Sequence, residues 1–165
     1  MPTPPIDLHD AASYELAVRV GLAWREIRRG ASMGTVRDYL FGQGDDALEQ
    51  GQMDTLDLLD REHSWRMSEL ADALRVDPST ATRAVQRLIS AGLATRSASD
   101  DDGRVVMVSI TPEGSALHAQ VDTRRAALLG HMLGAFDAAE RPVLADMLER
   151  FVQAVDDFVA DIDTA

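Results

Sequence analysis

Between residues 68 and 112 the apolar residues change their spacing, and this change limits the possible folds more than any other feature of the chain. Up to Ala91 they recur every three or four positions, as on one face of a helix. From Leu93 onward they alternate, as in a strand with one buried face. The stretch therefore predicts short helices followed directly by a β-hairpin.

Turn and capping residues divide the helical part into two short helices. The first is expected from Ser68 to Leu74, and Arg75-Val76 makes the turn after it. Asp77-Pro78 combines an N-cap residue with proline at the first helical position, where no N–H is needed. The second helix, residues 78–91, ends before Gly92, which suits the left-handed conformation that often terminates a helix.

The alternating part, residues 93–110, predicts two strands. Leu93 to Ser97 forms the first and Arg104 to Ile110 the second, joined by a polar loop with an Asp-Gly turn signal. Thr111-Pro112 then repeats the cap-plus-proline signature and opens a long helix toward His131.

Helical patterns also flank this stretch. Residues 1–9 are proline-rich and expected to be extended, and a helix follows over 10–29. Glycines break residues 30–46, although Val36 to Phe41 can form a short helix there. Further helices are expected over 48–60 and 138–161, and the last of these carries a wide apolar stripe.

The expected fold is therefore mainly α with a small β-hairpin wing. It is a winged helix-turn-helix flanked by N- and C-terminal dimerisation helices. Dimerisation is expected because a monomer of this size offers the apolar stripe of the last helix little to pack on. An intramolecular bundle is the alternative use of that stripe. We expect an arm, dimerisation helix and linker over 1–47, a DNA-binding domain over 48–111 and C-terminal dimerisation helices over 112–165.

The charge of the chain is unevenly divided. Its 165 residues carry a net charge of −12, and all 16 basic residues are arginines. Taken alone, this charge argues against nucleic acid and anionic membranes. However, residues 1–60 hold 5 arginines and 11 acidic residues, and residues 105–165 hold 4 arginines and 10 acidic residues. Residues 61–104 hold 7 arginines and 7 acidic residues and are therefore neutral. Because residues 78–99 contain three arginines and no acid, they are the part suited to meet DNA.

Several other classes of protein are excluded or disfavoured. The chain has no cysteine, which rules out disulfides and thiol chemistry. No apolar run reaches the roughly 18 residues of a membrane span, and residues 1–7 do not form a signal peptide. We therefore expect a cytoplasmic protein with no membrane partner.

Neither a metal site nor an active site is indicated by local spacing. The four histidines do not pair at i, i+4, so each is expected at the surface or satisfied by neighbours, and a metal site shared across a dimer stays open. The carboxylates accompany no nucleophile signature and no glycine-rich phosphate loop. We expect no enzyme activity, no catalytic residue, no metal and no cofactor.

The second short helix presents a polar face of the residue types that read base edges in the major groove. These residues are Ser79, Thr80, Thr82, Arg83 and Gln86. We expect Arg87 and Arg96 to meet phosphates, Arg104 to enter a narrow minor groove, and the free amides at the helix N-terminus to face a phosphate. Each residue alone favours a solvated helical surface, but the combination of cap, polar face, glycine stop and basic hairpin favours DNA binding.

These segments resemble the MarR family of bacterial transcriptional regulators, which are dimeric winged-helix proteins. The resemblance rests on Glu69 to Leu74, on Asp77 to Arg83 with Arg87-Leu88 and Gly92-Leu93, on Asp102-Gly103-Arg104 and on Ile110 to Gly114. Residues 48–59 resemble the family helix with its glutamine and spaced leucines, although Glu49 stands where a capping threonine is usual. Arg75 replaces a frequent glycine, which implies about 1 kcal/mol of strain if the residue is left-handed.

The resemblance also implies roles for particular residues. Asp102 would brace the wing and Arg104 would contact DNA, while the neighbouring acids Asp100 and Asp101 would repel phosphate. Family members often bind small, commonly aromatic, effectors. Such a ligand would fit a pocket lined by Trp24, Tyr39, Met53 and Trp65, although each of these also suits ordinary core packing.

The sequence thus predicts a homodimeric regulator of double-stranded DNA, an effector-responsive repressor of a palindromic operator. Helix 78–91 would lie in the major groove and wing 93–110 in the minor groove. The alternative is a winged-helix module for protein or ligand binding with little DNA affinity, for which the net charge and the acidic wing tip argue.

Overall fold

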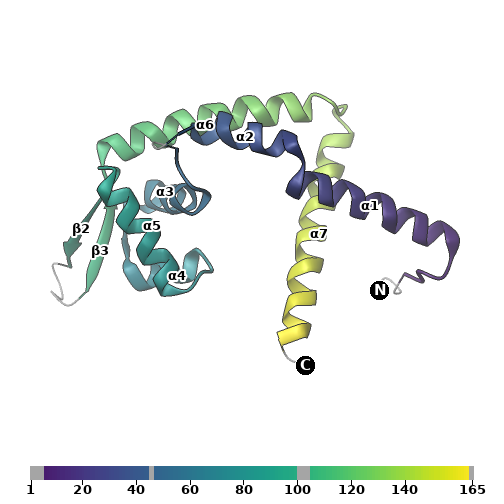
Figure 1. Ribbon diagram of the computed structural model, residues 1–165, viewed down its shortest axis with the longest axis horizontal. Coiled ribbons are helices and arrows are strands. Elements are labelled where there is room, and N and C mark those ends of the chain that lie inside the picture. The colour runs from purple at the N-terminus through teal and green to yellow at the C-terminus, as the bar shows by residue number, and fades with distance from the viewer. Residues whose placement is uncertain (1–5, 45–46, 100–104, 164–165) are drawn as a thin grey trace. The chain divides into compact units, whose positions relative to one another are not determined.

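The computed structural model describes residues 6–44, 47–99 and 105–163 (Figure 1). The chain forms two compact units, Met1–Val121 and Asp122–Ala165. Their boundary falls inside a long helix, α6 (Pro112–Leu133). The three-part division expected at residues 48 and 112 stays a prediction. Within the described ranges, no helix is long and apolar enough to cross a membrane.

Two helices precede the winged helix. α1 (Ala11–Arg29) begins after Asp10, whose carboxylate accepts a hydrogen bond from the Ser13 N–H at 2.9 Å. Gly30 separates α1 from α2 (Ala31–Phe41). α2 confirms the short helix expected in the glycine-rich connection, but it begins earlier than Val36. Its last residue, Phe41, is buried and joins the hydrophobic core.

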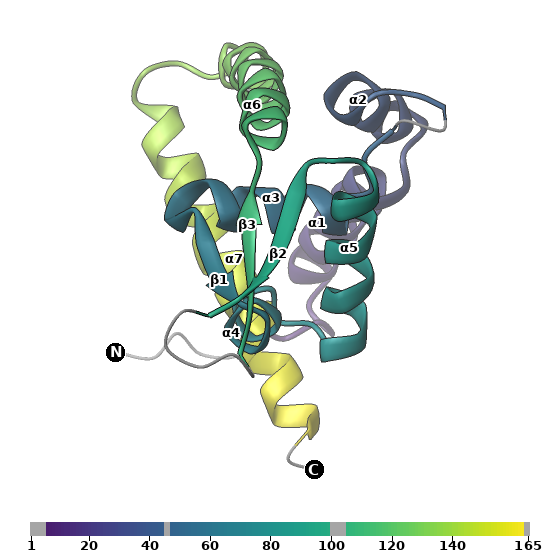
Figure 2. The ribbon, with the colours of Figure 1, turned by 90° about the vertical axis from the view of Figure 1, so that its left-hand side faces the viewer.

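The winged helix consists of three helices and a three-stranded antiparallel sheet (Figure 2). Its elements are α3 (Gln50–Glu62), β1 (Ser64–Arg66), α4 (Met67–Ala73), α5 (Pro78–Ser90), β2 (Ala94–Ala98) and β3 (Val106–Ile110). The ends of the three helices lie within two residues of those expected from the sequence. The helix-turn-helix and its hairpin are therefore confirmed.

The expectation of only two strands was wrong. β1 pairs with β3, with Trp65 opposite Val108, so the strand order is β1-β3-β2. The Trp65 indole N–H donates to the backbone carbonyl of Leu58 in α3 at 2.9 Å, which fixes the strand against the helix. Three residues are too few to display an alternating pattern, and α4 follows directly, so the sequence hid this strand.

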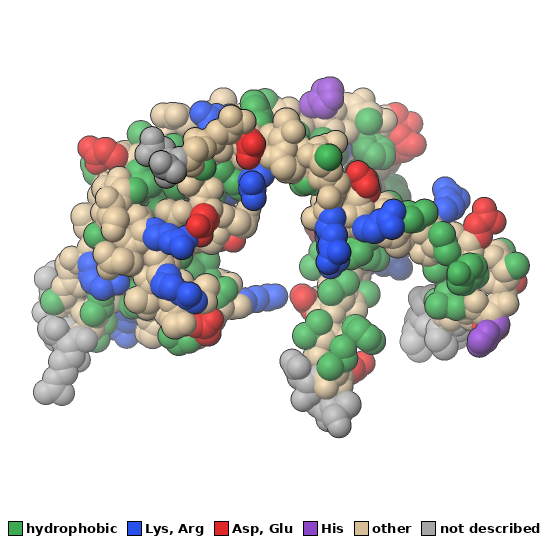
Figure 3. Space-filling model, in the orientation of Figure 1, with side chains coloured by type: hydrophobic (Ala, Val, Ile, Leu, Met, Phe, Trp, Pro, Cys, Tyr) green, Lys and Arg blue, Asp and Glu red, His purple; other side chains and the backbone are tan. Residues whose placement is uncertain are grey.

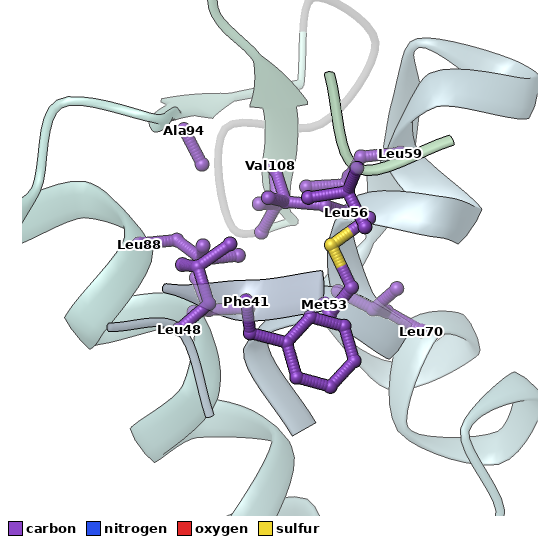
Figure 4. Close-up of a cluster of buried hydrophobic side chains, with 11 residues drawn as sticks. Phe41, Leu48, Met53, Leu56, Leu59, Leu70, Leu88, Ala94 and Val108 are labelled. Carbon is purple, nitrogen blue, oxygen red and sulfur yellow. The ribbon is translucent and has the colours of Figure 1, made fainter. Parts of the chain in front are cut away.

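One apolar core holds these elements together (Figure 4). α3 and α5 supply five of its eleven buried residues, β3 closes one side, and Phe41 and Leu48 enter from the preceding segment. The fully buried side chains include Met53, Leu56, Leu59, Leu70, Val85, Leu88 and Val108. Burying such side chains stabilises the fold by about 1.5–3 kcal/mol each. Leu74 at the end of α4 and Ala84 on α5 are only half-buried.

Two glycines set the path of the chain around the wing. Gly92 has φ +73°, which confirms the left-handed stop after α5. Thr111 caps α6: its hydroxyl accepts from the Gly114 N–H at 3.0 Å and donates to the Gly92 carbonyl at 2.8 Å. A Cβ at Gly114 would lie 2.2 Å from the Leu93 carbonyl oxygen. This close approach explains why the segment after the wing requires glycine.

The second unit contains the end of α6 and helix α7 (Glu140–Asp163). α7 confirms the expected last helix and begins two residues later than Ala138. Its apolar stripe is exposed in the single chain. The exposed residues are Val143, Met147, Leu148, Phe151, Val152, Val155, Phe158, Val159 and Ile162.

Candidate nucleic-acid interface

Asp77 organises the beginning of α5. Its Oδ1 accepts from the Ser79 N–H at 3.0 Å, the Ser79 hydroxyl at 2.5 Å and the Thr80 N–H at 3.0 Å. Its Oδ2 accepts from the Thr80 hydroxyl at 2.6 Å. The two hydroxyls, Ser79 first, hold the pKa of Asp77 far below the usual carboxyl value, because each hydrogen bond favours the ionised form.

This cap changes what the start of α5 can offer to DNA. The N–H groups of Ser79 and Thr80, expected to face a phosphate, already donate to the Asp77 carboxylate. A phosphate at this point would have to displace a negatively charged acceptor. The amides at this helix end are therefore not free, contrary to the expectation, and their contact with DNA stays a prediction.

The polar face of α5 lies opposite its buried face. Ala81, Val85 and Leu88 are buried against the core. Of the α5 residues expected to read bases or meet phosphates, Thr80 is half-buried. The others are exposed: Ser79, Thr82, Arg83, Gln86 and Arg87. Figure 3 shows basic side chains gathered over this part of the first unit. The structure thus brings the proposed contact residues together on one solvent-facing surface.

Within that face, Arg83 and Gln86 differ from the hydroxyl residues in their partners. The Arg83 guanidinium is exposed and its Nη2 lies 3.4 Å from the Thr80 hydroxyl, so most of its donors point to solvent. The Thr82 hydroxyl donates to the Pro78 carbonyl at 2.7 Å, one turn earlier in the helix. Arg83 offers the forked donors of its guanidinium to a base edge, and Gln86 offers one amide donor and one amide acceptor.

Arg87 has an ion-pair partner that the sequence did not indicate. Its Nη1 pairs with a carboxylate oxygen of Glu49, the residue before α3. Glu49 also forms a capping box with Gln52, whose side chain accepts from the Glu49 N–H at 2.9 Å. An open groove of about 800 Å³ is lined by both members of the pair together with Arg83 and Gln86. An acidic side chain therefore stands beside an arginine expected to bind phosphate.

The wing is described only in part. Arg96 lies on β2 opposite Val108 and is exposed, as a phosphate contact requires. Arg104 and Asp102, the residues expected to enter the minor groove and to brace the wing, lie outside the described residues.

His118 is the most buried of the histidines, and it joins α6 to α3. Its Nε2 lies 2.9 Å from Oδ1 of Asp57 and its Nδ1 lies 3.4 Å from Oδ2 of Asp60. This arrangement satisfies the imidazole with two carboxylates. In the described chain, a metal ion has one candidate group of ligands, Asp57 and His118 with Asp122 one turn further along α6.

The four residues expected to line an effector pocket have different environments. Met53 is fully buried in the core, and the Trp65 indole N–H donates to the Leu58 carbonyl. Trp24 is exposed on α1 with the Arg28 guanidinium 5.7 Å from its ring centroid. Tyr39 is half-exposed on α2. Their shared role in a pocket stays a prediction.

Comparison with known proteins identifies the class of this fold. The MarR family model matches residues 48–106, which cover the winged helix from α3 to the first residue of β3. The transcriptional regulator YdgJ of Bacillus subtilis is 26% identical over 103 residues, covering 62% of this chain and 63% of its own length. The transcriptional repressor MdtR of the same organism is 29% identical over 105 residues, covering 64% of this chain and 68% of MdtR.

A solved structure extends the likeness beyond the winged helix. Streptococcus pneumoniae FabT, solved in complex with DNA, superposes with a TM-score of 0.74 at 20% identity, covering 86% of this chain and 99% of FabT. At that identity the likeness shows a shared fold. Together with the match over residues 48–106, it shows that the chain has a winged-helix fold. The match to the MarR family model covers residues 48–106 of the 165, and both curated relatives are transcriptional regulators.

Proposed function

We propose that the protein is a homodimeric transcriptional regulator that represses genes by binding a palindromic operator. α5 lies in the major groove and the wing in the adjacent minor groove. The observation that carries the proposal is the exposed face of α5, which places Arg83, Gln86 and Arg87 side by side in a segment free of acidic residues from 78 to 99. A protein of this kind acts where the chromosome is, in the bacterial cytoplasm.

The dimensions and side chains of α5 suit the major groove. An α-helix with its side chains is about 10–12 Å wide, and the groove is about 12 Å wide. Arg83 can donate two hydrogen bonds to guanine, and Gln86 can form two with adenine. Arg96 on β2 is exposed beside α5 and supplies a charge for the backbone.

The terminal helices support a dimer. α1 and α7 each expose a row of large apolar side chains, which a single chain leaves in contact with water. Exposed apolar surface of this extent marks an interaction site in a monomeric fold. A second copy of the same chain would cover these rows, and twofold symmetry would set two α5 helices about 34 Å apart along DNA.

The effector is a proposal of its own. A cavity of about 530 Å³ lies between α1 and α2, with Met33, Leu40 and Phe41 on its apolar side and Arg28 and Arg37 on its charged side. We place the effector here rather than among the four residues expected from the sequence. Aromatic carboxylates should raise the thermal midpoint of the wild type but not of Arg37→Gln. Equal shifts in both proteins would refute this placement.

Binding to DNA tests the main proposal against its rival, a winged-helix module with little DNA affinity. Fluorescence anisotropy should detect binding to fragments from the region upstream of the protein's own gene. If a dimer neutralises about six phosphates, the logarithm of affinity falls with the logarithm of salt with a slope of roughly −5. Absence of binding at low salt would support the rival.

Two arginine variants locate the contact. Arg83→Gln should weaken binding to the preferred sequence by about 1–3 kcal/mol, because a bidentate base contact is lost. Arg19→Gln removes the same charge from exposed α1 and should leave DNA affinity within twofold of the wild type. Equal losses in both variants would show that only overall charge matters.

A further inference from the structure

The hydroxyl groups on α5 share one property that the sequence does not reveal. Ser79 and Thr80 donate to the Asp77 carboxylate, and Thr82 donates to the Pro78 carbonyl. A hydroxyl has a single proton and two lone pairs. Each of these side chains has therefore turned its proton toward its own helix, which leaves only lone pairs to offer to DNA, and one lone pair of Thr80 accepts from Nη2 of Arg83 at 3.4 Å.

We propose that Ser79 and Thr80 act on DNA only as hydrogen-bond acceptors and so select the exocyclic amino groups of adenine and cytosine in the major groove. The inference rests on the proposed DNA-binding function and adds to it the chemical group that these two residues recognise. The amino groups are adenine N6 and cytosine N4, the hydrogen-bond donors that bases present in that groove.

The Asp77 carboxylate is what holds the two protons. Each of its oxygens accepts a hydroxyl proton, at 2.5 Å from Ser79 and 2.6 Å from Thr80. These lengths are those of charge-assisted O–H···O⁻ bonds, about twice as strong as neutral ones. An ionised carboxylate has no proton to offer in return. A neutral base acceptor such as guanine N7 cannot compete with it for the same proton.

The same geometry excludes phosphate as the partner of these hydroxyls. Phosphate oxygens are acceptors, so a contact requires a donor from the protein. Ser79 and Thr80 have their hydroxyl and amide protons committed to Asp77. The carboxylate also repels a second anion at this point. Donation to DNA from this face therefore falls to Arg83, Gln86 and Arg87.

Base analogues test the proposal atom by atom. The preferred duplex is first selected from a random pool with the wild-type protein. Each adenine is then replaced by purine, which lacks the 6-amino group, and each cytosine by 5-methyl-2-pyrimidinone, which lacks the 4-amino group. At one or two positions the wild type should lose about 3- to 30-fold in affinity, the worth of one hydrogen bond and its unsatisfied partner.

Two protein variants assign those positions. Ser79→Ala and Thr80→Val remove the hydroxyls while keeping the size of the side chain, so each should lose its sensitivity to the amino group at one position. Ser90→Ala, on the same helix with its hydroxyl bonded to the Gln86 carbonyl, is the matched control and should keep wild-type sensitivity. Circular dichroism confirms that each variant is folded.

A third variant reverses the expected chemistry. Asp77→Asn keeps a good N-cap residue but offers one N–H₂ donor, which releases a hydroxyl proton. Its selected sequences should shift toward guanine or thymine at the position assigned to that hydroxyl, because O6, N7 and O4 are acceptors.

Other outcomes overturn the proposal. It is wrong if Ser79→Ala and Thr80→Val lose sensitivity to 7-deazaguanine, which lacks the N7 acceptor, or to methylphosphonate, which lacks a phosphate charge. It is also wrong if both variants keep wild-type sensitivity at every position while Arg83→Gln loses sensitivity to 7-deazaguanine. In that case the proposed DNA-binding function stands. Failure of the wild type to select any duplex refutes both.

Discussion

Asp77 fixes the start of α5 and the direction of the hydroxyls beside it. Its position as N-cap was evident from the Asp-Pro pair, because proline at the first helical turn requires no N–H. The four hydrogen bonds to its carboxylate were not evident, since they depend on side-chain rotamers. The sequence therefore located the recognition helix correctly and misjudged its free amides.

Asp77 should make the stability of the fold depend on pH. Its pKa is lower in the folded than in the unfolded chain, so its contribution is complete above about pH 4 and is lost as the pH falls through the folded-state pKa. Wild type should therefore exceed Asp77→Asn in thermal midpoint by a few degrees at neutral pH, and this gap should narrow steadily as the pH falls below about 4. A gap that is as large at about pH 2 as at neutral pH would contradict the assignment.

Arg75 carries backbone strain in the turn between α4 and α5. Its φ is +54°, which confirms the left-handed conformation considered from the sequence. Because glycine adopts this conformation without a Cβ clash, Arg75→Gly should raise the free energy of unfolding by about 0.5–1 kcal/mol in urea titrations. Ala73→Gly, in the right-handed α4, should lower it by a similar amount. Destabilisation by Arg75→Gly would show that its side-chain contacts outweigh the strain.

At the level of elements, the ends of helices were easier to predict than contacts between them. Gly92 and the two cap-plus-proline pairs gave the limits of α5 and α6 because their signals are local. β1 has three residues and no local signal, and it exists because Trp65 packs on α3 and pairs with β3. The Glu49–Arg87 ion pair joins residues far apart in the chain, so no spacing rule could reveal it.

This ion pair gives a prediction for the surface between α3 and α5. Glu49 neutralises Arg87 in the free protein, so a phosphate must displace it. Glu49→Gln keeps an oxygen for the cap, and it should tighten binding to duplex DNA about two- to fivefold, the range for an exposed ion pair. The gain should be measured by anisotropy and should vanish in the Arg87→Gln background.

Asp38→Asn provides the matched control for Glu49→Gln. It removes one negative charge from another exposed ion pair, Arg37–Asp38 on α2. Because this pair involves no residue of α5, the affinity for DNA should not change. An equal gain in both variants would mean that lowering the net negative charge explains the effect.

At the level of the whole molecule, the −12 charge and the apolar stripes lie outside the proposed contact face. The acidic excess belongs to residues 1–60 and 105–165, while the segment with α5 and β2 is rich in arginine. Charge alone would have excluded nucleic acid, and only its division along the chain pointed to DNA. The winged-helix fold followed from local patterns, whereas the proposed effector site depends on surfaces that no local pattern describes.

The proposed dimer makes a prediction about mass. Sedimentation at micromolar concentration should give twice the 18.0 kDa of one chain. Phe158→Glu places a charge in the apolar stripe of α7 and should shift the mass toward that of a monomer. Gln153→Glu adds the same charge to the polar side of α7 and should leave the dimer intact. Wild type that sediments as a monomer would contradict the dimer.

A footprint on the DNA upstream of the protein's own gene tests the central claim most directly. A dimer that reads DNA with two α5 helices should protect two half-sites about one helical turn apart, related by a palindrome. Arg83→Gln should abolish this protection at concentrations where Arg19→Gln retains it. Uniform protection, or none at low salt, would contradict sequence-specific recognition by α5.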